Sequence, residues 1–353
     1  MTKHTLSIGI IGTGMIGTKH IRDFNSVPGS KVTAIADLDP ERLENLAEEY
    51  AIPETATDYR EVLRLPDLDA VVVCVPPHLQ EQICTDALKA GKHVLCEKPM
   101  AMTARSAQRM VKIAKKYKKI LACCASRFLF SPTVIRAKEM IERGELGAIY
   151  HISMVGISRR YRPCLEYHTN CDWGLDKAKA GGGVLMDWGI YDLGILYGLL
   201  PSLAVHTVEG FCFQGIDHPA REGLVFNVEE HGGAALRCAD GLVVFWERAW
   251  AAHMTSRPRV RIYGSKAGLS FDPLALTKDI FFELYEDRSG KPVTVAPDMN
   301  QEKWDIHKSV AFDFVEAVKG LHPPKIGGEA MIKYLQIIEA VYRSSAKKKG
   351  VRV

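Results

Sequence analysis

A glycine-rich hexapeptide close to the N-terminus has the spacing of a nucleotide-phosphate turn. Gly12-Thr13-Gly14-Met15-Ile16-Gly17 reads G-x-G-x-x-G and directly follows the apolar run of residues 6–11. In such a strand–turn–helix junction, the first glycine makes the tight turn, the second lets the backbone approach a pyrophosphate, and the third lets the helix pack closely on the strand. The N–H groups that open the helix then face the phosphates. A glycine-rich turn without a ligand is the alternative.

A carboxylate follows the next apolar run at the place where a ribose needs an acceptor. Residues 32–36 are Val-Thr-Ala-Ile-Ala, and Asp37 comes 20 residues after Gly17. At this spacing a carboxylate accepts a hydrogen bond from the 2′-hydroxyl of NAD, and it repels the 2′-phosphate of NADP. Arg42 is the only nearby cation that could offset the repulsion. We therefore expect NAD rather than NADP.

Two further segments carry side chains suited to proton chemistry. Glu97-Lys98-Pro99 ends the fourth predicted strand, Lys92-His93-Val94-Leu95-Cys96, and ligands of doubly wound sheets bind at the carboxyl ends of strands. Gly181-Gly182-Gly183 leads into a helix-like pattern in which Asp187 and Tyr191 are four residues apart and so share one face. For the first segment the alternative is a surface salt bridge at a strand end, and the Lys98–Pro99 bond is either cis or trans. For the second segment the alternative is a glycine linker into a core helix, with a buried aspartate whose hydrogen bonds are made within the protein.

The pattern of predicted secondary structure, which must position these residues, changes after residue 125. Before it, short apolar strands alternate with helices, which predicts a parallel doubly wound sheet. After it, long hairpin arms dominate, with turns at His231-Gly232, Asp240-Gly241 and Ser289-Gly290. The predicted strands are 6–11, 31–36, 70–75, 93–96, 120–124, 148–158, 204–214, 223–230, 233–239, 242–251, 258–264, 268–272 and 279–286, and the predicted helices are 15–26, 40–50, 79–90, 103–117, 131–143, 302–320 and 328–346.

These elements predict an α/β protein of two domains. Residues 1–125 form a Rossmann dinucleotide-binding domain. Residues 126–353 form an α+β domain with a large open, mostly antiparallel sheet, which binds substrate, and the C-terminal helices can pack back on the first domain. The exposed face of such a sheet favours a homodimer or homotetramer formed through it.

Composition excludes several other classes. A net charge of +4 over 353 residues is too small to indicate nucleic-acid binding. Nine cysteines without CxxC or metal-ligand spacing predict free thiols in a reducing compartment and no metal site. The sequence shows no signal peptide and no apolar stretch of membrane-spanning length. We therefore expect a cytoplasmic protein that contacts no membrane.

The ordered set of G-x-G-x-x-G, Asp37, Glu97-Lys98-Pro99 and the glycine triplet before Asp187 and Tyr191 resembles the glucose–fructose oxidoreductase / inositol dehydrogenase / MocA (Gfo/Idh/MocA) family. The resemblance spans the chain, and Glu-Lys-Pro at a strand end is its most specific part. It implies a nicotinamide-dependent oxidoreductase that acts on CH–OH groups of sugars, cyclitols or related diols. Two departures are Val75-Pro76-Pro77-His78-Leu79-Gln80, which lacks the Asn and the His of the family's usual Thr-Pro-Asn-x-x-His, and Ser126, where Asn is common.

The resemblance also implies roles for single residues. Lys98 corresponds to the catalytic lysine and binds the reacting oxygen, Asp187 corresponds to a conserved aspartate, and Tyr191 stands where a histidine is usual. The proton acceptor stays open between Tyr191 and Lys98, because a phenol with a pKa of about 10 needs a nearby cation to act near neutrality. The implied cofactor contacts are Gly12, Gly14, Met15, Ile16, Gly17, Asp37, Val75, Pro76, His78, Glu97 and Lys98, and Arg127 is the implied substrate contact. By position alone, Arg160 follows the first long predicted strand and either binds substrate or forms a solvated edge. His168, Asn170 and Trp173 lie in the loop before the glycine triplet, where we expect a substrate lid.

Two other functions compete with a dehydrogenase. Some relatives retain NAD and hydrolyse glycosides without net redox change, and others are non-enzymatic nucleotide sensors or regulators. The retention of Lys98, Asp187 and Tyr191 together disfavours a sensor.

Overall fold

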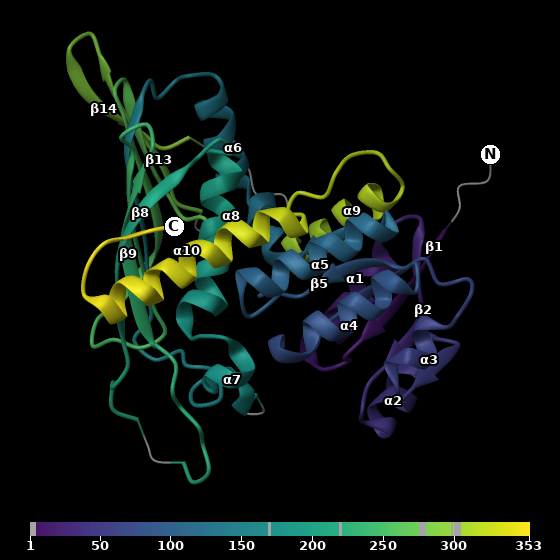
Figure 1. Ribbon diagram of the computed structural model, residues 1–353. Helices are drawn as coiled ribbons and strands as arrows, with labels where there is room; N and C mark the ends of the chain where they lie inside the picture. The colour runs from purple at the N-terminus through teal and green to yellow at the C-terminus, as the bar shows by residue number, and fades with distance from the viewer. Residues whose placement is uncertain (1–4, 169–170, 219–220, 275–279, 298, 300–304) are drawn as a thin grey trace. The chain divides into compact units, whose positions relative to one another are not determined.

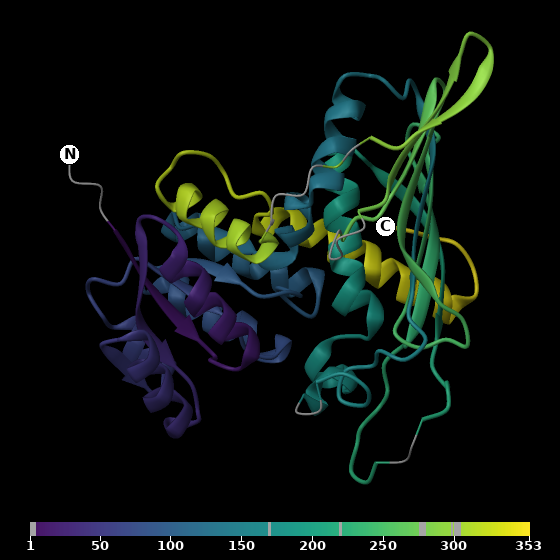
Figure 2. The same ribbon diagram turned by 180° about the vertical axis from the view of Figure 1, so that it is seen from behind.

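The computed structural model describes residues 5–168, 171–218, 221–274, 280–297, 299 and 305–353. The chain divides into two compact units (Figures 1 and 2). The first contains residues 1–127 and 305–333, and the second contains residues 128–304 and 334–353. The first unit thus takes in a C-terminal segment that lies far away in the sequence.

The first unit is a doubly wound parallel sheet of six strands in the order β3-β2-β1-β4-β5-β6, which confirms the predicted fold class. Strands β1 and β4 read as apolar runs because both of their faces are buried. The strands are β1 (Leu6–Ile11), β2 (Ser30–Ala36), β3 (Glu54–Ala56), β4 (Ala70–Val73), β5 (His93–Cys96) and β6 (Leu121–Cys123), and the helices are α1 (Met15–Ser26), α2 (Pro40–Tyr50), α3 (Tyr59–Leu63), α4 (Pro77–Lys89), α5 (Ala104–Tyr117) and α9 (Ile306–Val318).

Local signals explain most of these boundaries. Asp39 caps α2 by accepting a hydrogen bond from the N–H of Arg42 at 3.1 Å, and Pro40 occupies the first turn of that helix. The sequence reading missed β3 and α3, because a three-residue strand and a five-residue helix are too short to show periodicity. Helix α9 packs on α1, where Phe24 meets Phe314 edge to face with ring centroids 6.2 Å apart.

The second unit is built on a sheet of nine strands in the order β14-β13-β12-β11-β7-β10-β9-β8-β15. All neighbouring strands run antiparallel except β7 and β10, which run parallel. The strands are β7 (Ile149–Ile157), β8 (Val205–Phe213), β9 (His231–Cys238), β10 (Val243–Ala249), β11 (Ser256–Gly264), β12 (Ala267–Phe271), β13 (Phe282–Arg288), β14 (Lys291–Val295) and β15 (Val351–Arg352), and the helices are α6 (Pro132–Glu142), α7 (Lys177–Ala180), α8 (Ile190–Leu199) and the end of α10 (Gly328–Lys347).

Two predictions in this sheet are wrong. Residues 223–230 form no strand, because the carboxylates of Glu229 and Glu230 accept hydrogen bonds from loop N–H groups and hold the segment out of the ladder. His231-Gly232 is no hairpin turn but lies inside β9, opposite Ala249 and Arg248. Glycine serves close packing there, since a Cβ at Gly232 would lie 2.9 Å from a methyl carbon of Leu185.

The two faces of the nine-stranded sheet differ. Helices α6 and α8 lie against one face (Figures 1 and 2), and α10 packs on β8, where the N–H of Gly210 donates to Ser344 Oγ at 2.9 Å. No helix of the described residues covers the other face. That face carries an outer aromatic row, defined here as His151, Phe211, Phe213, Phe245, Tyr263 and Tyr285.

Candidate functional site

The glycine turn has the geometry that a pyrophosphate requires. Gly12 has a φ of 88°, and a Cβ there would lie 2.6 Å from the carbonyl oxygen of Cys74. A Cβ at Gly17 would collide with the carbonyl oxygen of Gly12, whereas a Cβ at Gly14 would meet nothing within 4 Å. Among the residues that the structure describes, no side chain caps the N-terminus of α1. The turn is therefore closed on its protein side and open on the side where a phosphate would bind.

Asp37 lies at the end of β2 and is fixed toward this turn. Its carboxylate accepts from the N–H of Thr13 at 2.6 Å, from Thr13 Oγ1 at 2.9 Å and from the N–H of Asp39 at 3.1 Å. Arg42 lies 3.3 Å away. Burial would raise the pKa of this carboxyl, but the Thr13 and Asp39 hydrogen bonds and the Arg42 charge lower it overall. Asp37 is thus an anion near neutral pH, with a partly exposed cation beside it.

Glu97 is the centre of a buried network at the end of β5. Its carboxylate lies 2.9 Å from His20 Nε2 and 3.5 Å from Arg127 Nη2, and it accepts from the N–H of Lys98 at 3.0 Å. Burial opposes ionisation, but the His20 hydrogen bond and the charges of Arg127, His20 and Lys98 hold the pKa of Glu97 well below its usual range. The network keeps an anion directly before Lys98, whose bond to Pro99 is cis.

Three potential metal-ligand atoms meet in the same network. Atoms of His20, Glu97 and Cys124 lie within 4.8 Å of one another. Arg127 already supplies positive charge to Glu97, and burial raises the pKa of the Cys124 thiol well above its usual range, which favours the neutral thiol over the thiolate that binds metals. The contacts of these three groups among the described residues are hydrogen bonds and the charge of Arg127.

Three further predicted cofactor contacts lie in the loop after β4 and in the first turn of α4. Val75 and Pro76 are half-buried in this loop, and the carbonyl of Val75 accepts a hydrogen bond from the side chain of Gln80 at 3.0 Å. His78 is exposed in the first turn of α4. The loop packs against the glycine turn through the contact between Cys74 and Gly12.

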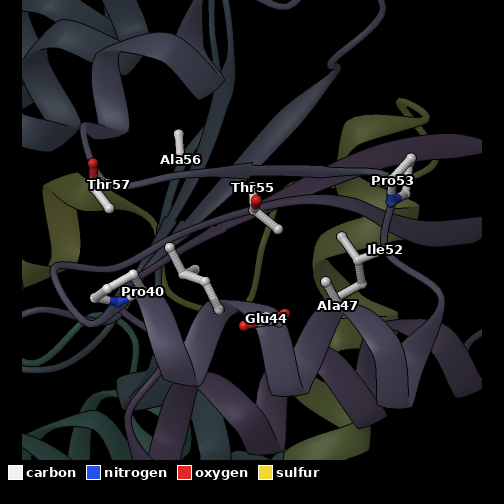
Figure 3. A pocket seen from close by; sticks show the side chains of 9 residues that line it. Pro40, Glu44, Ala47, Ile52, Pro53, Thr55, Ala56 and Thr57 are labelled. Carbon is white, nitrogen blue, oxygen red and sulfur yellow. The ribbon is translucent and has the colours of Figure 1, made fainter.

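A groove of about 380 Å³ lies elsewhere in the first unit, between α2 and β3 (Figure 3). Pro40 and Thr57 stand at one end of it, and Ile52 and Pro53 stand at the other. None of the predicted site residues lines this groove. It is a groove at the edge of the six-stranded sheet, distinct from the phosphate turn.

In the second unit, the glycine triplet packs closely against other residues of the chain. A Cβ at Gly183 would collide with the carbonyl of Glu229, and one at Gly182 would collide with the hydroxyl of Tyr342. The Glu229 carboxylate accepts from the N–H groups of Gly183 at 2.8 Å and Leu185 at 3.1 Å and from the Tyr342 hydroxyl at 2.9 Å. This contact anchors the start of the helical segment that carries Asp187.

Asp187 and Tyr191 are joined by a π-helical turn, Leu185–Gly189, and not by a regular α-helix. The prediction that Asp187 and Tyr191 share one face rested on the spacing of a regular α-helix, whereas a π turn has more residues per turn. Such π turns occur frequently at functional sites. The half-buried Asp187 accepts a hydrogen bond from Trp250 Nε1 at 3.0 Å. Tyr191 is 2 % exposed.

Tyr191 belongs to an aromatic cluster, defined here as Phe128, Tyr161, Tyr167, Trp188 and Tyr191. Phe128 meets Tyr191 edge to face with ring centroids 4.8 Å apart, and Trp188 lies 5.8 Å from Tyr191. Tyr161 stacks on Tyr167 at 4.4 Å and lies 6.5 Å from Trp188. The sequence reading missed this cluster, since its members come from three separate segments.

The predicted substrate residues differ in their surroundings. Arg160 is exposed, with Glu166 at 3.8 Å, and Arg127 is held by Glu97 in the first unit. The His168 ring lies 3.7 Å from that of Tyr167. Trp173 is half-buried in the short helix Asp172–Leu175, and Asn170 lies outside the described residues.

Buried ion pairs support the second unit and were also missed. Asp192 accepts from Trp246 Nε1 at 2.9 Å and from Arg248 Nε at 2.6 Å. Arg162 is fully buried and lies 2.9 Å from Glu230. The signal in the sequence was weak, because a charge in an apolar segment reveals burial but not its partner.

Two sequence models of one oxidoreductase family match the chain. The model described as "Oxidoreductase family, NAD-binding Rossmann fold" matches residues 6–124, and "GFO/IDH/MocA C-terminal domain" matches residues 134–270. The chain belongs to the Gfo/Idh/MocA oxidoreductase family. The resemblance drawn from the motifs is confirmed, and the first unit of this Gfo/Idh/MocA protein is an NAD-binding Rossmann domain.

Named members are similar to this Gfo/Idh/MocA chain over nearly its whole length. Myo-inositol 2-dehydrogenase of Thermotoga maritima is 24% identical, covering 99% of this chain and 98% of that protein. D-glucoside 3-dehydrogenase of Escherichia coli is 28% identical, covering 100% and 98%. The structure of levoglucosan dehydrogenase with NADH and levoglucosan superimposes with a TM-score of 0.86 at 22% identity over 99% of each chain, which supports the fold. None of the described helices has the length and apolarity needed to cross a membrane.

Proposed function

We propose that this chain is an NAD-dependent dehydrogenase that interconverts a CH–OH group and a carbonyl on a sugar, cyclitol or related diol. The observation that carries the proposal is the phosphate turn, open at Gly14 and faced by the ionised Asp37. Myo-inositol, glucosides and levoglucosan appear in the names of its relatives and are all polyhydroxylated rings. The residues present fit NAD, since open N–H groups suit its phosphates and a carboxylate suits its ribose hydroxyl.

NAD, when bound, supplies the acceptor for the hydride in alcohol oxidation. Lys98 donates a hydrogen bond to the reacting oxygen and stabilises the negative charge that develops on it. The proton of that oxygen passes to Tyr191 or to Lys98. Asp187, held by Trp250, orients a substrate hydroxyl or Lys98. The Glu97 network fixes the backbone at Lys98, and Glu97 bonds the nicotinamide ribose.

We further propose NAD in preference to NADP. The anionic Asp37 repels a 2′-phosphate, and its hydrogen bonds to Thr13 hold it in place. Arg42 is paired with Asp37 and Asp39, at 3.3 and 3.0 Å, so its charge is already partly neutralised. Val75, Pro76 and His78 line the cofactor in this proposal.

The substrate-binding side is proposed to lie in the second unit. The aromatic cluster offers ring faces that suit the C–H faces of a sugar or cyclitol, and Asp187 offers a hydrogen-bond acceptor for hydroxyls. Arg160, His168 and Trp173 are the proposed polar and aromatic contacts of the adjoining loop, and Arg127 is proposed to contribute from the first unit.

The assembly and location are part of the proposal. The outer aromatic row favours a homodimer or homotetramer formed through the nine-stranded sheet. Nine free cysteines favour a reducing compartment such as the cytoplasm. A net charge of +4 offers no basis for nucleic-acid binding.

The test is a substrate panel of inositols, aldoses, glucosides, polyols and dihydrodiols, each followed by NADH absorbance with NAD and with NADP. We expect NADH to form in proportion to the alcohol oxidised for at least one polyhydroxylated ring. Cleavage of a glycoside without net NADH would instead assign redox-neutral hydrolysis, and NAD binding without turnover on the whole panel would contradict the dehydrogenase.

A further inference from the structure

Two cysteine thiols lie in contact in the loop between β7 and α7. The sulfur atoms of Cys164 and Cys171 are 3.2 Å apart. A disulfide needs about 2.0 Å between sulfurs, so a shift of about 1 Å would join them. This pair belongs to none of the roles proposed above.

The fold of the loop holds the two sulfurs together. Cys164 has a φ of 68° and His168 a φ of 49°, so the chain bends back twice within five residues. The N–H of Cys164 donates to the carbonyl of Tyr167 at 2.7 Å, and the thiol of Cys171 donates to the carbonyl of His168 at 2.8 Å. Arg221 ties both ends, because it donates to the carbonyl of Cys164 at 2.9 Å and to the carboxylate of Asp172 at 3.1 Å. The thiol contact is therefore fixed by hydrogen bonds on both sides.

The two thiols differ in exposure and acidity. Cys164 is 2 % exposed, whereas Cys171 is half-buried and accessible. A hydrogen bond from Cys164 lowers the pKa of the Cys171 thiol, and the same hydrogen bond, with burial, raises the pKa of Cys164. Cys171 is thus the nucleophile and Cys164 the resolving thiol of such a pair.

We propose that Cys164 and Cys171 form a reversible intramolecular disulfide on exposure to hydrogen peroxide. The Cys171 thiolate attacks one peroxide oxygen, the O–O bond breaks, and a sulfenic acid and one water form after proton transfer. The Cys164 sulfur then attacks the Cys171 sulfur, the S–O bond breaks, and a second water leaves with the Cys164 proton. The two sulfurs together lose two electrons, and a dithiol reductant restores both thiols by exchange.

The bond would constrain the loop that carries Tyr161 and Tyr167. These rings belong to the aromatic cluster, and Cys171 lies close enough to Asp187 to feel its charge. Under the proposed function, on which this consequence alone rests, oxidation changes the KM of the alcohol several-fold and leaves the KM of NAD unchanged.

The sequence permits a direct test by mass spectrometry on the full chain. Trypsin cuts after Arg160 and Lys177 and leaves Cys164 and Cys171 alone together in one peptide, while a protease that cuts after glutamate separates them at Glu166. After peroxide treatment and alkylation, we expect the tryptic peptide to lose two hydrogens and to take up no alkyl group. Cleavage at Glu166 should leave two linked fragments that a dithiol releases, and alkylatable thiols should fall from nine to seven.

Matched variants complete the test. In Cys164→Ser, Cys171 should accumulate as a sulfenic acid that a cyclic diketone traps, and in Cys171→Ser, Cys164 should stay reduced. Cys212→Ser, at another half-buried cysteine, should form the same disulfide as the wild type. Alkylation of both cysteines after peroxide, or a disulfide that joins either to a third cysteine, would overturn the proposal. Since the mass readout needs no turnover, failure of the dehydrogenase proposal would leave it standing.

Discussion

At the scale of single residues, some acidic and basic side chains stabilise the fold and others are open to contact with a ligand. Asp192 and Arg162 are buried among charged partners of their own unit. Breaking such pairs leaves a buried charge uncompensated, so they are poor candidates for direct chemistry and good ones for positioning. Lys98 and Asp187 are half-buried, which is compatible with contact to a ligand.

Lys98→Met should lower kcat by at least about a hundredfold, the usual effect of removing one donor to a developing oxyanion. NAD affinity, measured by quenching of protein fluorescence, should change little because the phosphate turn is intact. Lys89→Met, at the exposed end of α4, is the matched control and should behave like the wild type. A Lys98→Met enzyme with kcat within a few-fold of the wild type would remove Lys98 from the mechanism.

Tyr191→Phe should lower kcat by about 10²–10⁴-fold if the phenol transfers the proton. The ring would keep its packing on Phe128 and Trp188, so the thermal midpoint should be nearly unchanged. The pH–rate profile should also lose the limb that belongs to the phenol. An unchanged profile with normal kcat would assign the proton to Lys98 or to a bound water.

Asp37 should determine cofactor choice. The wild type should have the higher kcat/KM with NAD, and Asp37→Asn should reduce the NAD-to-NADP ratio by about tenfold or more, because one neutralised charge next to a phosphate is worth over 1.4 kcal/mol. Steady-state kinetics with both cofactors measure the ratio. A wild-type preference for NADP would contradict this assignment.

At the scale of elements, helix starts carry much of the electrostatic design. Glu229 places a carboxylate at the start of the helical segment before Asp187, where N–H groups are unsatisfied. Asp305 caps α9 by accepting from the N–H groups of His307 and Lys308 at 3.0 and 3.1 Å. The start of a helix carries the positive end of the helix dipole, so it disfavours a positive charge on the His307 ring.

His307 should make stability depend on pH. Burial, with the charges of Arg127 and Lys19, lowers the pKa of His307 to about 3 from 6.5, although Glu97 opposes the shift. The unfolded chain therefore binds a proton below pH 6.5 that the folded chain binds only near pH 3. The stability is fully present above pH 6.5 and is lost as the pH falls through this window.

His307→Asn should flatten that dependence. Thermal midpoints measured from about pH 7 down to 5, above the ordinary pKa values of Asp and Glu, should fall less steeply for the variant than for the wild type. His93, whose pKa burial also lowers, contributes in the same direction and leaves a residual slope. His78→Asn, at an exposed position, should retain the wild-type slope; equal slopes for all three proteins would contradict the assignment.

At the scale of the whole molecule, the outer aromatic row is the surface that most needs a partner. His151 lies 5.0 Å from both Phe245 and Tyr263, so the row is continuous across three strands. Phe245 is 53% exposed although it is central in the sheet. Contiguous exposed aromatics of this kind mark interaction surfaces.

Phe245→Glu should convert the assembly to monomers or weaken it strongly, because a charge placed in an apolar interface must be desolvated. Sedimentation velocity measures the change. Phe312→Glu, at a phenylalanine of α9 with 45% exposure, is the control and should sediment like the wild type. A wild-type protein that sediments as a monomer would disprove the proposed oligomer.

The sequence by itself determined the features that depend on local spacing. The alternation of the longer strands and helices in the first unit, the glycine turn after β1, Asp37 at the end of β2 and Glu97-Lys98-Pro99 at the end of β5 all follow from periodicity and from residues within a few positions of one another. Even the two-unit division was visible as a change of pattern near residue 125, although the contact boundary follows Arg127 and residues 305–333 join the first unit.

Only the tertiary structure decided the partners of buried polar groups. His20 and Glu97 are 77 residues apart in sequence, and Asp187 and Trp250 are 63 residues apart. The glycine triplet is a place where the backbone can approach another group closely, and the structure shows that the groups are Glu229 and Tyr342. A charged residue in an apolar segment, or a run of glycines, indicates that another group of the protein or a ligand lies close to it. Which group does so depends on long-range packing, which local spacing does not encode.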